Sequence, residues 1–521
     1  MTQSSEKISE LIFTKKLSKI SLFFLFIILL LLFNGCASDP FLDIYETPIP
    51  EDLESTPIVE STSPIESPTT AIVEEIPIDD FESIEPILPD YNLHVIFDYS
   101  SQTAQVSQTI NFTNNSSEPL STILLACDPL RYPGSFILEK ALINSEQEIQ
   151  LVDNKFYFSL DLPQSLNPGE LIEILINYRL QVPPFPAPSG DRKPAIFGYS
   201  VVQTNFVDWY PFIPPLDQKG NWILHDPWFY GEYLVYDLAN FEIEIELLNT
   251  LPGTTIAASA LPIEKKENSY IYKTQKSRNF AWSLSPSYVV ESKEVNGITV
   301  TTYTFPYHQQ IGTHILEETA KSIELFSDIF SPYPRDSLSI VEGDFFDGME
   351  YDGLFFLGKG YFNLFDFTPQ NYLTFIAVHE TAHQWWYTSV ANNQALEPWL
   401  DEALCTYSEL LYYEYFYPEL VNWWWEYRVN FYQPEGYINK PIYDYQGFIP
   451  YRDATYLRGA IFLQKLRNDI GDQVFFEILN EYANSQEDKI SSEAIFLQIV
   501  KEFSGIDPLE NYPEFLRNLQ D

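Results

Sequence analysis

Apolar and polar residues alternate along much of the chain between about Tyr91 and Lys293. The clearest example is 241–247, Phe-Glu-Ile-Glu-Ile-Glu-Leu, where every second residue is apolar, as in a strand with one buried face. Further candidate strands lie at 93–97, 106–112, 155–162 and 171–180, separated by stretches that contain Pro, Gly, Asn and Ser. The pattern predicts a β-rich N-terminal domain, sandwich-like or saddle-like, over residues 91–293.

The pattern changes after Gly297. Strands are expected at 298–305 and near 337–341, and a helix is expected at 313–331 between them. Apolar residues share one side of this helix, and Pro332 follows it: Ile315, Leu316, Ile323, Phe326 and Phe330. Several further helical segments follow toward the C-terminal end. Helices beside a small sheet indicate a second domain of the α+β class over residues 294–521.

Two helices are expected in the middle of this second domain. The pair Thr368-Pro369 offers a capping residue and a first-position proline for the first helix. Its apolar residues recur at helical spacing: Leu373, Ile376, Ala377 and Ala382. The second helix is expected to begin near Glu397-Pro398 and to continue through Leu404, Tyr407, Leu410 and Leu411.

The first of these helices carries the run His379-Glu380-Thr381-Ala382-His383, which fits the H-E-x-x-H pattern of zinc hydrolases. Two histidines four residues apart project from one helix face and can bind one zinc ion at about 2.0–2.1 Å. A catalytic zinc takes three protein ligands and keeps an open position, and Glu402 on the next helix is the candidate third ligand. Glu380 lies about 100° around the helix, where it can reach a water molecule instead of the metal. We therefore predict one zinc ion per chain.

Composition excludes one class of partner. The 521 residues are enough for two or three domains. The 74 acidic and 29 basic residues give a net charge of −45. Such a chain repels the phosphates of nucleic acids, so nucleic-acid binding is not expected. Solubility through net charge is the simplest interpretation of this excess.

The N-terminus has the pattern of a secretion signal, with basic residues before the apolar run Ile20–Phe33. Fourteen helical residues reach about 21 Å, which is short of a hydrocarbon core of about 30 Å. Asn34-Gly35-Cys36-Ala37 resembles a bacterial lipoprotein signal, which predicts a signal over 1–36 and a lipid on Cys36. Ordinary cleavage after Ala37 is the alternative. We expect export to the cell surface with a lipid as the only membrane anchor, or secretion in the alternative case.

Residues 37–90 are expected to be a disordered linker. They contain fifteen acidic residues and nine prolines, and no Lys, Arg or His. Such a segment buries too little apolar surface to offset the entropy of ordering it. It is typical of a self-repelling tether between a membrane and a folded domain.

Beyond the predicted signal only Cys127 and Cys405 remain, so no disulfide framework is implied. Cys405 lies three residues after Glu402 and can approach the metal, but a small buried packing residue is the favoured interpretation.

The second domain also resembles a known family, the gluzincin aminopeptidases. The residues that carry the resemblance are His379 to Trp386, then Glu397-Pro398-Trp399-Leu400-Asp401-Glu402, with Tyr407 and Glu409. The gap of eighteen residues between His383 and Glu402 belongs to the family signature. The resemblance covers roughly 320–510 and is fainter over 91–300. It implies a thermolysin-like zinc metallopeptidase domain behind the β-rich domain.

Two further motifs follow from this resemblance. Gly348-Met349-Glu350 is similar to the family's G-x-M-E-N motif, whose glutamate binds the free α-amino group of the substrate. The match departs at Tyr351, where the family has Asn, and at Asp352. Tyr456-Leu457-Arg458-Gly459-Ala460 is similar to the family's Y-x-K-G-A, whose tyrosine donates a hydrogen bond to the oxyanion. Gln203 is a weaker match to a glutamine that helps to bind the amine, and Asp401 and Glu409 are expected to orient the ligands.

The resemblance implies a zinc aminopeptidase whose partners are peptides with a free N-terminus. Glu380 and Tyr456 are the expected catalytic residues, and Glu350, Gly348 and Met349 are expected to bind the substrate. The chain ends near Phe515-Leu516, without the large C-terminal helical domain of many members, so a more open cleft is expected. An endopeptidase, a hydrolase of non-peptide substrates, and a surface binding module with a vestigial site are the alternatives. The sequence does not define the preferred side chain or the oligomeric state.

Overall fold

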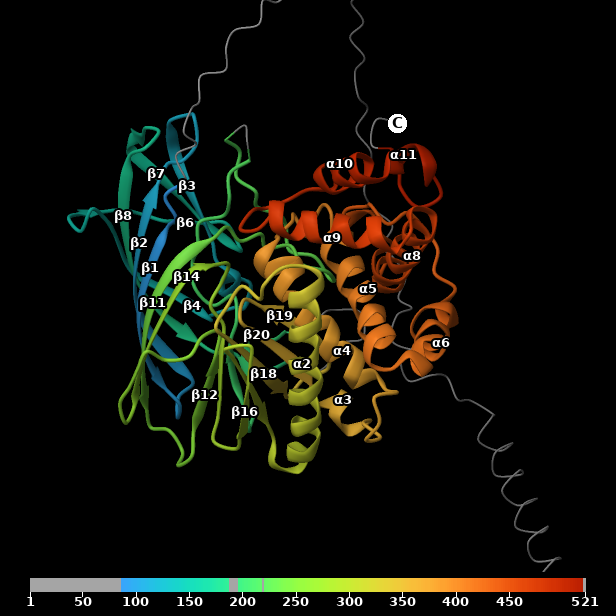
Figure 1. The fold of residues 1–521 in the computed structure, drawn as a ribbon. Coiled ribbons are helices and arrows are strands. Elements are labelled where there is room, and N and C mark those ends of the chain that lie inside the picture. Colours follow the sequence, from blue (N-terminus) through green and yellow to red (C-terminus); the bar gives the residue numbers. More distant parts are fainter. Residues whose placement is uncertain (1–85, 187–194, 218–219, 519–521) are drawn as a thin grey trace, which may run out of the picture. The chain divides into compact units, whose positions relative to one another are not determined.

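The structure is a computed structural model that describes residues 86–186, 195–217 and 220–518 (Figure 1). The predicted signal over 1–36 and nearly all of the predicted linker over 37–90 lie outside the described residues. Among the residues that are described, no helix combines the length and the apolar character that crossing a membrane requires.

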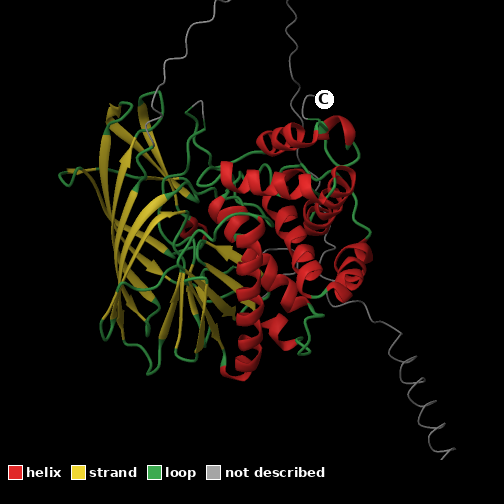
Figure 2. Ribbon diagram, viewed as in Figure 1, coloured by secondary structure: helices red, strands yellow, loops and turns green. Residues whose placement is uncertain are grey.

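The N-terminal part of the described chain is built of strands (Figure 2). Their bounds are β1 Asp90–Asp98, β2 Thr103–Thr113, β3 Leu120–Ala126, β4 Phe136–Ile143, β5 Gln147–Glu148, β6 Val152–Asp153, β7 Tyr157–Leu166, β8 Leu171–Gln181, β9 Gly198–Tyr199, β10 Thr204–Phe206, β11 Ala239–Leu248, β12 Thr255–Ala258, β13 Glu264–Lys265, β14 Ser269–Ser277 and β15 Trp282–Ser285. They form an eight-stranded sheet in the order β13-β14-β11-β1-β2-β8-β4-β5, a four-stranded sheet in the order β12-β15-β10-β9, and a three-stranded sheet in the order β3-β7-β6. The β-rich N-terminal part is thus confirmed.

The alternation that predicted these strands also sets their two faces. In β11 the apolar residues Phe241, Ile243, Ile245 and Leu247 are buried, whereas the glutamates between them face outward. β11 pairs in parallel with β1 and antiparallel with β14, so it lies inside the largest sheet. Its buried face belongs to a core that all three sheets share, in which the rings of Phe206 and Trp282 stack at 4.0 Å. One apolar face per strand is therefore enough to assemble this part.

A five-stranded sheet links the two parts of the chain. Its strands are β16 Val289–Val295, β17 Ile298–Thr304, β18 Ser337–Gly343, β19 Gly348–Tyr351 and β20 Leu354–Gly358, in the order β16-β17-β18-β20-β19. β17, β18 and β20 run parallel, and β19 lies antiparallel at the edge. The predicted border between residues 293 and 294 falls within β16, which pairs with β17.

Both faces of this sheet are covered. Val341 and Phe356 contribute to the core of the β-rich part, whereas Ile340 and Phe355 contribute to the core beneath the helices. Every residue of β18 and of β20 is buried, which explains the continuous apolar run at 354–357 in β20, whereas β18 also buries Ser337, Ser339 and Glu342. The sheet therefore lies between the two cores and holds β19 next to the helices.

Helices make up the remainder. Their bounds are α2 Gln309–Ile329, α3 Lys359–Asn363, α4 Tyr372–Ala382, α5 Trp399–Phe416, α6 Val421–Trp424, α7 Phe448–Arg452, α8 Gly459–Ile470, α9 Asp472–Ser485, α10 Glu493–Ser504 and α11 Pro508–Asn511. Short 3₁₀ segments lie at Asp128–Arg131, Pro306–His308, Pro418–Leu420, Asn430–Tyr432 and Ile442–Asp444. Three π-helical segments, Gln384–Ser389, Trp425–Val429 and Asp453–Arg458, complete the set in the described residues. The α+β class is confirmed.

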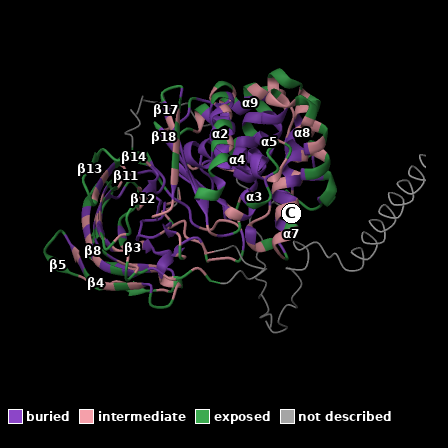
Figure 3. Ribbon diagram, turned by 90° about the horizontal axis from the view of Figure 1, so that it is seen from below, coloured by how far each residue is buried: buried purple, intermediate pink, exposed green. Residues whose placement is uncertain are grey.

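α4 and α5 lie at the centre of the helical part and are buried along most of their length (Figure 3). The second predicted helix start is confirmed, since α5 begins one residue after Pro398. The predicted cap of α4 is wrong. Asn371 caps this helix by accepting a hydrogen bond from the Thr374 backbone N–H at 3.0 Å, whereas the Thr368 hydroxyl donates to Asp366 at 2.8 Å. The helix therefore begins at Tyr372, because the Asn371 carboxamide reaches the free backbone N–H groups of its first turn.

Candidate active site

The three predicted metal ligands meet between α4 and α5. His379 lies in the last turn of α4, His383 is the capping residue directly after it, and Glu402 lies in the first turn of α5. Glu402 Oε2 is 3.1 Å from His379 Nε2 and 3.6 Å from His383 Nε2. One potential ligand atom from each residue lies within 4.8 Å of the other two, and all three side chains are buried. The structure thus brings together residues from both helices of the motif.

A second layer of side chains orients the first histidine. His379 Nδ1 lies 2.9 Å from Oε1 of Glu409, a residue of α5. Glu409 is fully buried and also accepts hydrogen bonds from Arg428 and from Trp424 Nε1. Because the hydrogen bond to Glu409 places the ring hydrogen of His379 on Nδ1, the lone pair of the ring lies on Nε2, which faces Glu402. The predicted orienting role of Glu409 agrees with this contact.

These residues fit a zinc ion. Two imidazole nitrogens and one carboxylate oxygen converge at one place, which is the ligand set of a catalytic zinc with three protein ligands. Burial alone would lower the pKa of His379, but hydrogen bonds to Glu402 and Glu409 raise it to about 9. Burial alone would raise the pKa of Glu402, but its hydrogen bonds to the histidines hold it well below its usual value. The carboxylate is therefore ionised, and a metal ion would displace the imidazole protons.

Glu380 lies beside these ligands without being one of them. Its Oε2 is buried and has no hydrogen-bond partner among the described residues. Burial raises the pKa of Glu380 to about 8, although the imidazoles of His383 and His379 lower it. A carboxylate that titrates near neutral pH is suited to accept a proton and to release it again.

Gly348 makes room for Glu380. A Cβ atom at Gly348 would lie 2.2 Å from Glu380 Oε1, a distance at which two atoms cannot coexist. Gly348 begins the edge strand β19, so the close approach of this strand to α4 depends on the missing side chain. Met349, the next residue, is half-buried and packs against the core of the β-rich part.

Tyr456 contacts two of the three ligands, Glu402 and His379. It lies in the π-helical segment Asp453–Arg458, and its hydroxyl donates a hydrogen bond to Glu402 Oε1. Its ring lies parallel to that of His379, with 5.8 Å between the centroids. Burial, reinforced by the charge of Glu402, raises its pKa well above 10, so the hydroxyl keeps its proton. π-helical turns often occur at functional sites, and this one carries the predicted donor.

Glu350 approaches from β19. Its side chain is 5% exposed and accepts a hydrogen bond from Gln394 Nε2 at 3.2 Å. A ligand atom of Glu350, one of His383 and one of Asp401 lie within 4.8 Å of one another. Glu350 is therefore a buried carboxylate next to the metal ligands, and not one more surface acid.

The departure from the family motif at Asp352 has a structural role. The Asp352 carboxylate accepts hydrogen bonds from Arg335 Nε and from the Arg278 backbone N–H, at 2.7 and 2.8 Å. The Arg278 guanidinium donates to the carbonyls of Thr388 and Ser389, both at 3.2 Å. These bonds tie β19 to the turn that follows α4.

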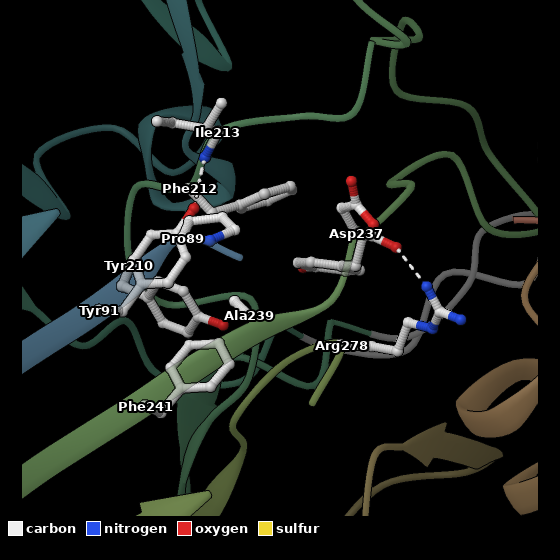
Figure 4. A pocket seen from close by; sticks show the side chains of 10 residues that line it. Pro89, Tyr91, Tyr210, Phe212, Ile213, Asp237, Ala239, Phe241 and Arg278 are labelled. Carbon is white, nitrogen blue, oxygen red and sulfur yellow. Dashed lines mark hydrogen bonds between the residues drawn. The ribbon is translucent and has the colours of Figure 1, made fainter. Parts of the chain in front are cut away.

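Figure 4 shows that the Arg278 guanidinium faces Asp237 at a small cavity. This cavity is lined by aromatic residues of the β-rich part, among them Tyr91, Tyr210 and Phe241, and its volume is about 10 Å³. It is too small for a substrate, and its lining residues all belong to the β-rich part, so we assign it to packing within that part.

Gln203 does not reach the site through any of its recorded contacts. Its amide nitrogen donates to Tyr288 and to the Glu342 carbonyl, at 2.6 and 2.9 Å, and its Oε1 accepts from the Asp344 backbone N–H at 2.8 Å. The side chain therefore joins β10 to the end of β18. Cys405 is fully buried and contacts His383, and burial raises the pKa of its thiol. Among the described residues, neither Cys405 nor Cys127 forms a disulfide.

Three residues of the site are missing from the sequence-based prediction: Gln394, Arg428 and Trp424. Gln394 lies in the amide-rich run Asn392-Asn393-Gln394 between the two ligand helices, which is a weak signal for a polar role. Arg428 and Trp424 lie more than a dozen residues beyond Glu409, in an aromatic stretch that carries no recognisable motif.

Comparisons with known proteins agree with this site. The model of the peptidase family M1 domain matches residues 314–511, which include every predicted metal ligand, Glu350 and Tyr456. Aminopeptidase M1-D and aminopeptidase M1-B of Oryza sativa subsp. japonica are both 29% identical to this chain, over 205 and 203 residues. Each alignment covers 36% of this chain and 23% of the relative, so the chain aligns with about a quarter of the length of these curated relatives.

Solved structures share the fold over a longer range. The crystal structure of an M1 zinc metallopeptidase from Deinococcus radiodurans superimposes with a TM-score of 0.57 and 19% identity, covering 80% of this chain and 91% of that chain. A mutant of the Deinococcus radiodurans M1 zinc metallopeptidase, bound to a Tyr-Ser-Ala substrate, gives a TM-score of 0.58 and 19% identity, covering 83% and 96%. The fold of these two structures therefore extends over both the β-rich part and the helical part, and the resemblance noted in the sequence is confirmed. Residues 314–511 of the chain match the peptidase family M1 domain, in agreement with the resemblance of this region to the gluzincin aminopeptidases.

Proposed function

We propose that this protein is a zinc-dependent aminopeptidase that removes N-terminal residues from peptides. The observation that carries the proposal is the position of the buried Glu350 carboxylate next to the His379, His383 and Glu402 cluster. A carboxylate held there pairs with the ammonium group of a peptide N-terminus, and it disfavours substrates whose N-terminus is blocked. The aminopeptidase relatives and the substrate-bound metallopeptidase support the same assignment.

His379, His383 and Glu402 would hold the zinc ion, one per chain. When bound, zinc supplies Lewis acidity, which polarises the substrate carbonyl and makes a neighbouring water more acidic. Glu380 removes a proton from the attacking water and then delivers it to the leaving amine, for which its unpartnered Oε2 is available. The Tyr456 hydroxyl keeps its proton and donates a hydrogen bond to the oxygen that becomes negative. Glu350 sets the register one residue from the N-terminus.

A panel of aminoacyl arylamides, assayed with and without a chelator, tests this function. We expect turnover that the chelator abolishes and zinc restores. Acetylation of the amino group should abolish cleavage, because Glu350 then has no ammonium partner. Equal cleavage of blocked and free substrates would contradict the aminopeptidase assignment and favour an endopeptidase or another hydrolase.

The variant Glu380→Gln separates chemistry from metal binding. It should retain one zinc per chain and lose nearly all turnover, because an amide cannot accept the proton. Glu477→Gln is a matched control, because Glu477 is an exposed residue of α9 that accepts a hydrogen bond from Gln473. A purified protein that binds no zinc would instead indicate a binding module with a vestigial site.

We also propose that the enzyme acts outside the cytoplasm on a lipid anchor at Cys36. Support comes from the basic and apolar N-terminal pattern and from the acidic segment 37–90. Labelling of the full chain with a radioactive fatty acid in a bacterial host tests the anchor. Label that disappears in Cys36→Ala is expected, and unlabelled wild-type protein in the medium would support cleavage after Ala37.

A further inference from the structure

We infer, on the basis of the proposed function, that Gln394 is a positioning residue that orients the Glu350 carboxylate toward the amino group of the substrate. Gln394 is 3% exposed and lies between two buried carboxylates. Its Nε2 donates to Glu350 Oε1 at 3.2 Å and to Asp401 Oδ2 at 2.7 Å. One amide nitrogen has two hydrogens, so a single group satisfies both contacts.

The direction of the amide follows from its neighbours. The nitrogen of Gln394, and not its oxygen, lies within hydrogen-bond distance of Glu350 Oε1 and Asp401 Oδ2. Without a donor between them, the facing oxygens of these two buried carboxyl groups would lack this hydrogen-bond partner, which is costly away from water. The amide therefore joins two buried acceptors that cannot satisfy one another.

Gln394 is itself fixed by its backbone surroundings. The Ala391 backbone N–H donates to the Lys489 carbonyl at 3.0 Å, and the Ala391 carbonyl accepts from the Ser491 N–H at 2.7 Å. On the other side of Gln394, the Ala395 carbonyl accepts from the Ile442 N–H at 2.9 Å. The segment is thus anchored on both sides of Gln394, which makes its side chain a rigid reference for Glu350.

The Asn392 side chain provides a second amide contact to Asp401. Asn392 Nδ2 lies 3.3 Å from Asp401 Oδ1 and donates to the Glu397 carbonyl at 2.9 Å. Both oxygens of Asp401 therefore have amide partners, and one of these partners, Gln394, also contacts Glu350.

The Glu350 carboxylate uses only part of its capacity to accept hydrogen bonds. The Gln394 contact is the only hydrogen bond recorded for the Glu350 side chain among the described residues, although a carboxylate offers about four acceptor positions. An ammonium group has three N–H donors, which need acceptors. The carboxylates near Glu350 make the electrostatic potential there more negative, which favours a cation. Gln394 occupies Oε1, which leaves Oε2 of Glu350 for the ammonium group.

Binding of the product and of its des-amino analogue to the zinc-loaded full enzyme tests this role. The two probes are the free amino acid whose arylamide is cleaved fastest and the same acid with hydrogen in place of the amino group. Gln394→Met keeps the length of the side chain and removes both donors. We expect the inhibition constant of the amino acid to rise about 10- to 100-fold, as for the loss of a hydrogen bond to a charged group, while that of the des-amino acid stays unchanged.

Two further variants complete the test. In a Glu350→Gln background, Gln394→Met should add no further loss of amino-acid binding, because its effect passes through Glu350. Gln105→Met is a matched control that removes a glutamine–glutamate hydrogen bond on the exposed surface of the β-rich part. If Gln394→Met fails to fold, Gln394→Glu keeps the shape and offers at most one proton to two carboxylates, so the same selective loss is expected.

The outcomes separate the two proposals. A wild-type enzyme that cleaves free and acetylated substrates equally would overturn the proposed function, and this inference with it. A wild-type enzyme that requires the free amine, with a Gln394→Met variant that binds both probes as before or loses both equally, would overturn the role of Gln394 alone.

Discussion

The Arg428 guanidinium donates two hydrogen bonds to the Glu409 carboxylate, from Nε to Oε2 and from one terminal nitrogen to Oε1, both at 3.0 Å. The Glu409 Oε1 that receives the second bond also contacts His379 Nδ1 at 2.9 Å. Arg428 is buried and stacks on the ring of Phe375, in the helix that carries His379. The orientation of the first metal ligand thus depends on a residue from a different helical segment.

Arg428→Met should therefore weaken zinc binding by about 10- to 100-fold, as is typical for the loss of an outer-shell partner of a metal ligand. Without the guanidinium, Glu409 loses its ion pair and is free to turn away from His379 or to take up a proton. Competition with a chromogenic chelator measures the affinity. Arg517→Met is the control, because its ion pair with Asp444 at 3.4 Å is exposed and should contribute little. Unchanged zinc affinity in Arg428→Met would show that Glu409 does not need its guanidinium partner.

Tyr456→Phe should lower kcat by about 10²- to 10³-fold and change KM by only a few-fold, because the hydroxyl is needed chiefly when negative charge develops on the substrate oxygen. Zinc content should stay at one ion per chain, since the Tyr456 hydroxyl contacts Glu402 but is not a ligand. Steady-state kinetics on the best arylamide measures both constants. Tyr415→Phe, which alters a tyrosine that is 68% exposed near the end of α5, is the control. A rise in KM with unchanged kcat would assign Tyr456 to substrate binding instead.

The features that could be predicted from the sequence depend on spacing within one segment. His379 and His383 share a helix face because they are four residues apart, and β11 shows its buried face through simple alternation. The prediction of Glu402 as the third ligand also required the number of residues between the histidines on α4 and their partner on α5. The family signature supplied that number. The signals of the two histidines and of β11 are local, so one chain without relatives is enough to find them.

The missing parts depend on contacts between distant segments. Gln394 reaches Glu350 across 44 positions of sequence, and Arg278 reaches Ser389 across 111. No periodicity predicts which side chains meet when a sheet edge is folded onto a helix pair. The error at Thr368 has a more local origin: two capping residues compete within four positions, and the Asp366 carboxylate engages the Thr368 hydroxyl.

Gly348→Ala should reduce kcat by about 100-fold without loss of zinc. The added Cβ would lie 2.2 Å from Glu380 Oε1 and 3.3 Å from the Ile376 side chain, so the Glu380 carboxylate must move from its present place. A misplacement of about 1 Å in a reacting group costs a loss of this order. Kinetics and zinc analysis check the result.

Gly360→Ala is the matched control for this substitution. Its added Cβ would meet only the ring of Phe346, which is 57% exposed and can turn away. If Gly348→Ala keeps full kcat, the position of Glu380 in the structure is not the one used in catalysis.

Glu397→Gln should make stability less sensitive to pH. Burial raises the pKa of Glu397 from 4.5 to about 7, with the Glu493 charge adding to the rise and the Glu493 backbone N–H opposing it. Because the folded pKa lies above the unfolded one, the neutral carboxyl contributes its full stability below about pH 4.5, and this contribution is lost as pH rises to about 7. The shift corresponds to at most about 3 kcal/mol. The carboxamide introduced by the substitution can still accept the Glu493 N–H bond, which Glu397 accepts at 3.0 Å.

We therefore expect the variant and the wild type to unfold at similar urea concentrations near pH 4.5, and the variant to be the more stable above pH 7. Both proteins should be measured with a chelator present, so that zinc binding does not add its own pH dependence. Glu502→Gln, at an exposed carboxylate of α10, should shift neither end of the profile. A constant difference between Glu397→Gln and the wild type across pH 4.5–8 would mean that Glu397 is ionised throughout, because only a proton taken up in the folded state makes the difference grow with pH.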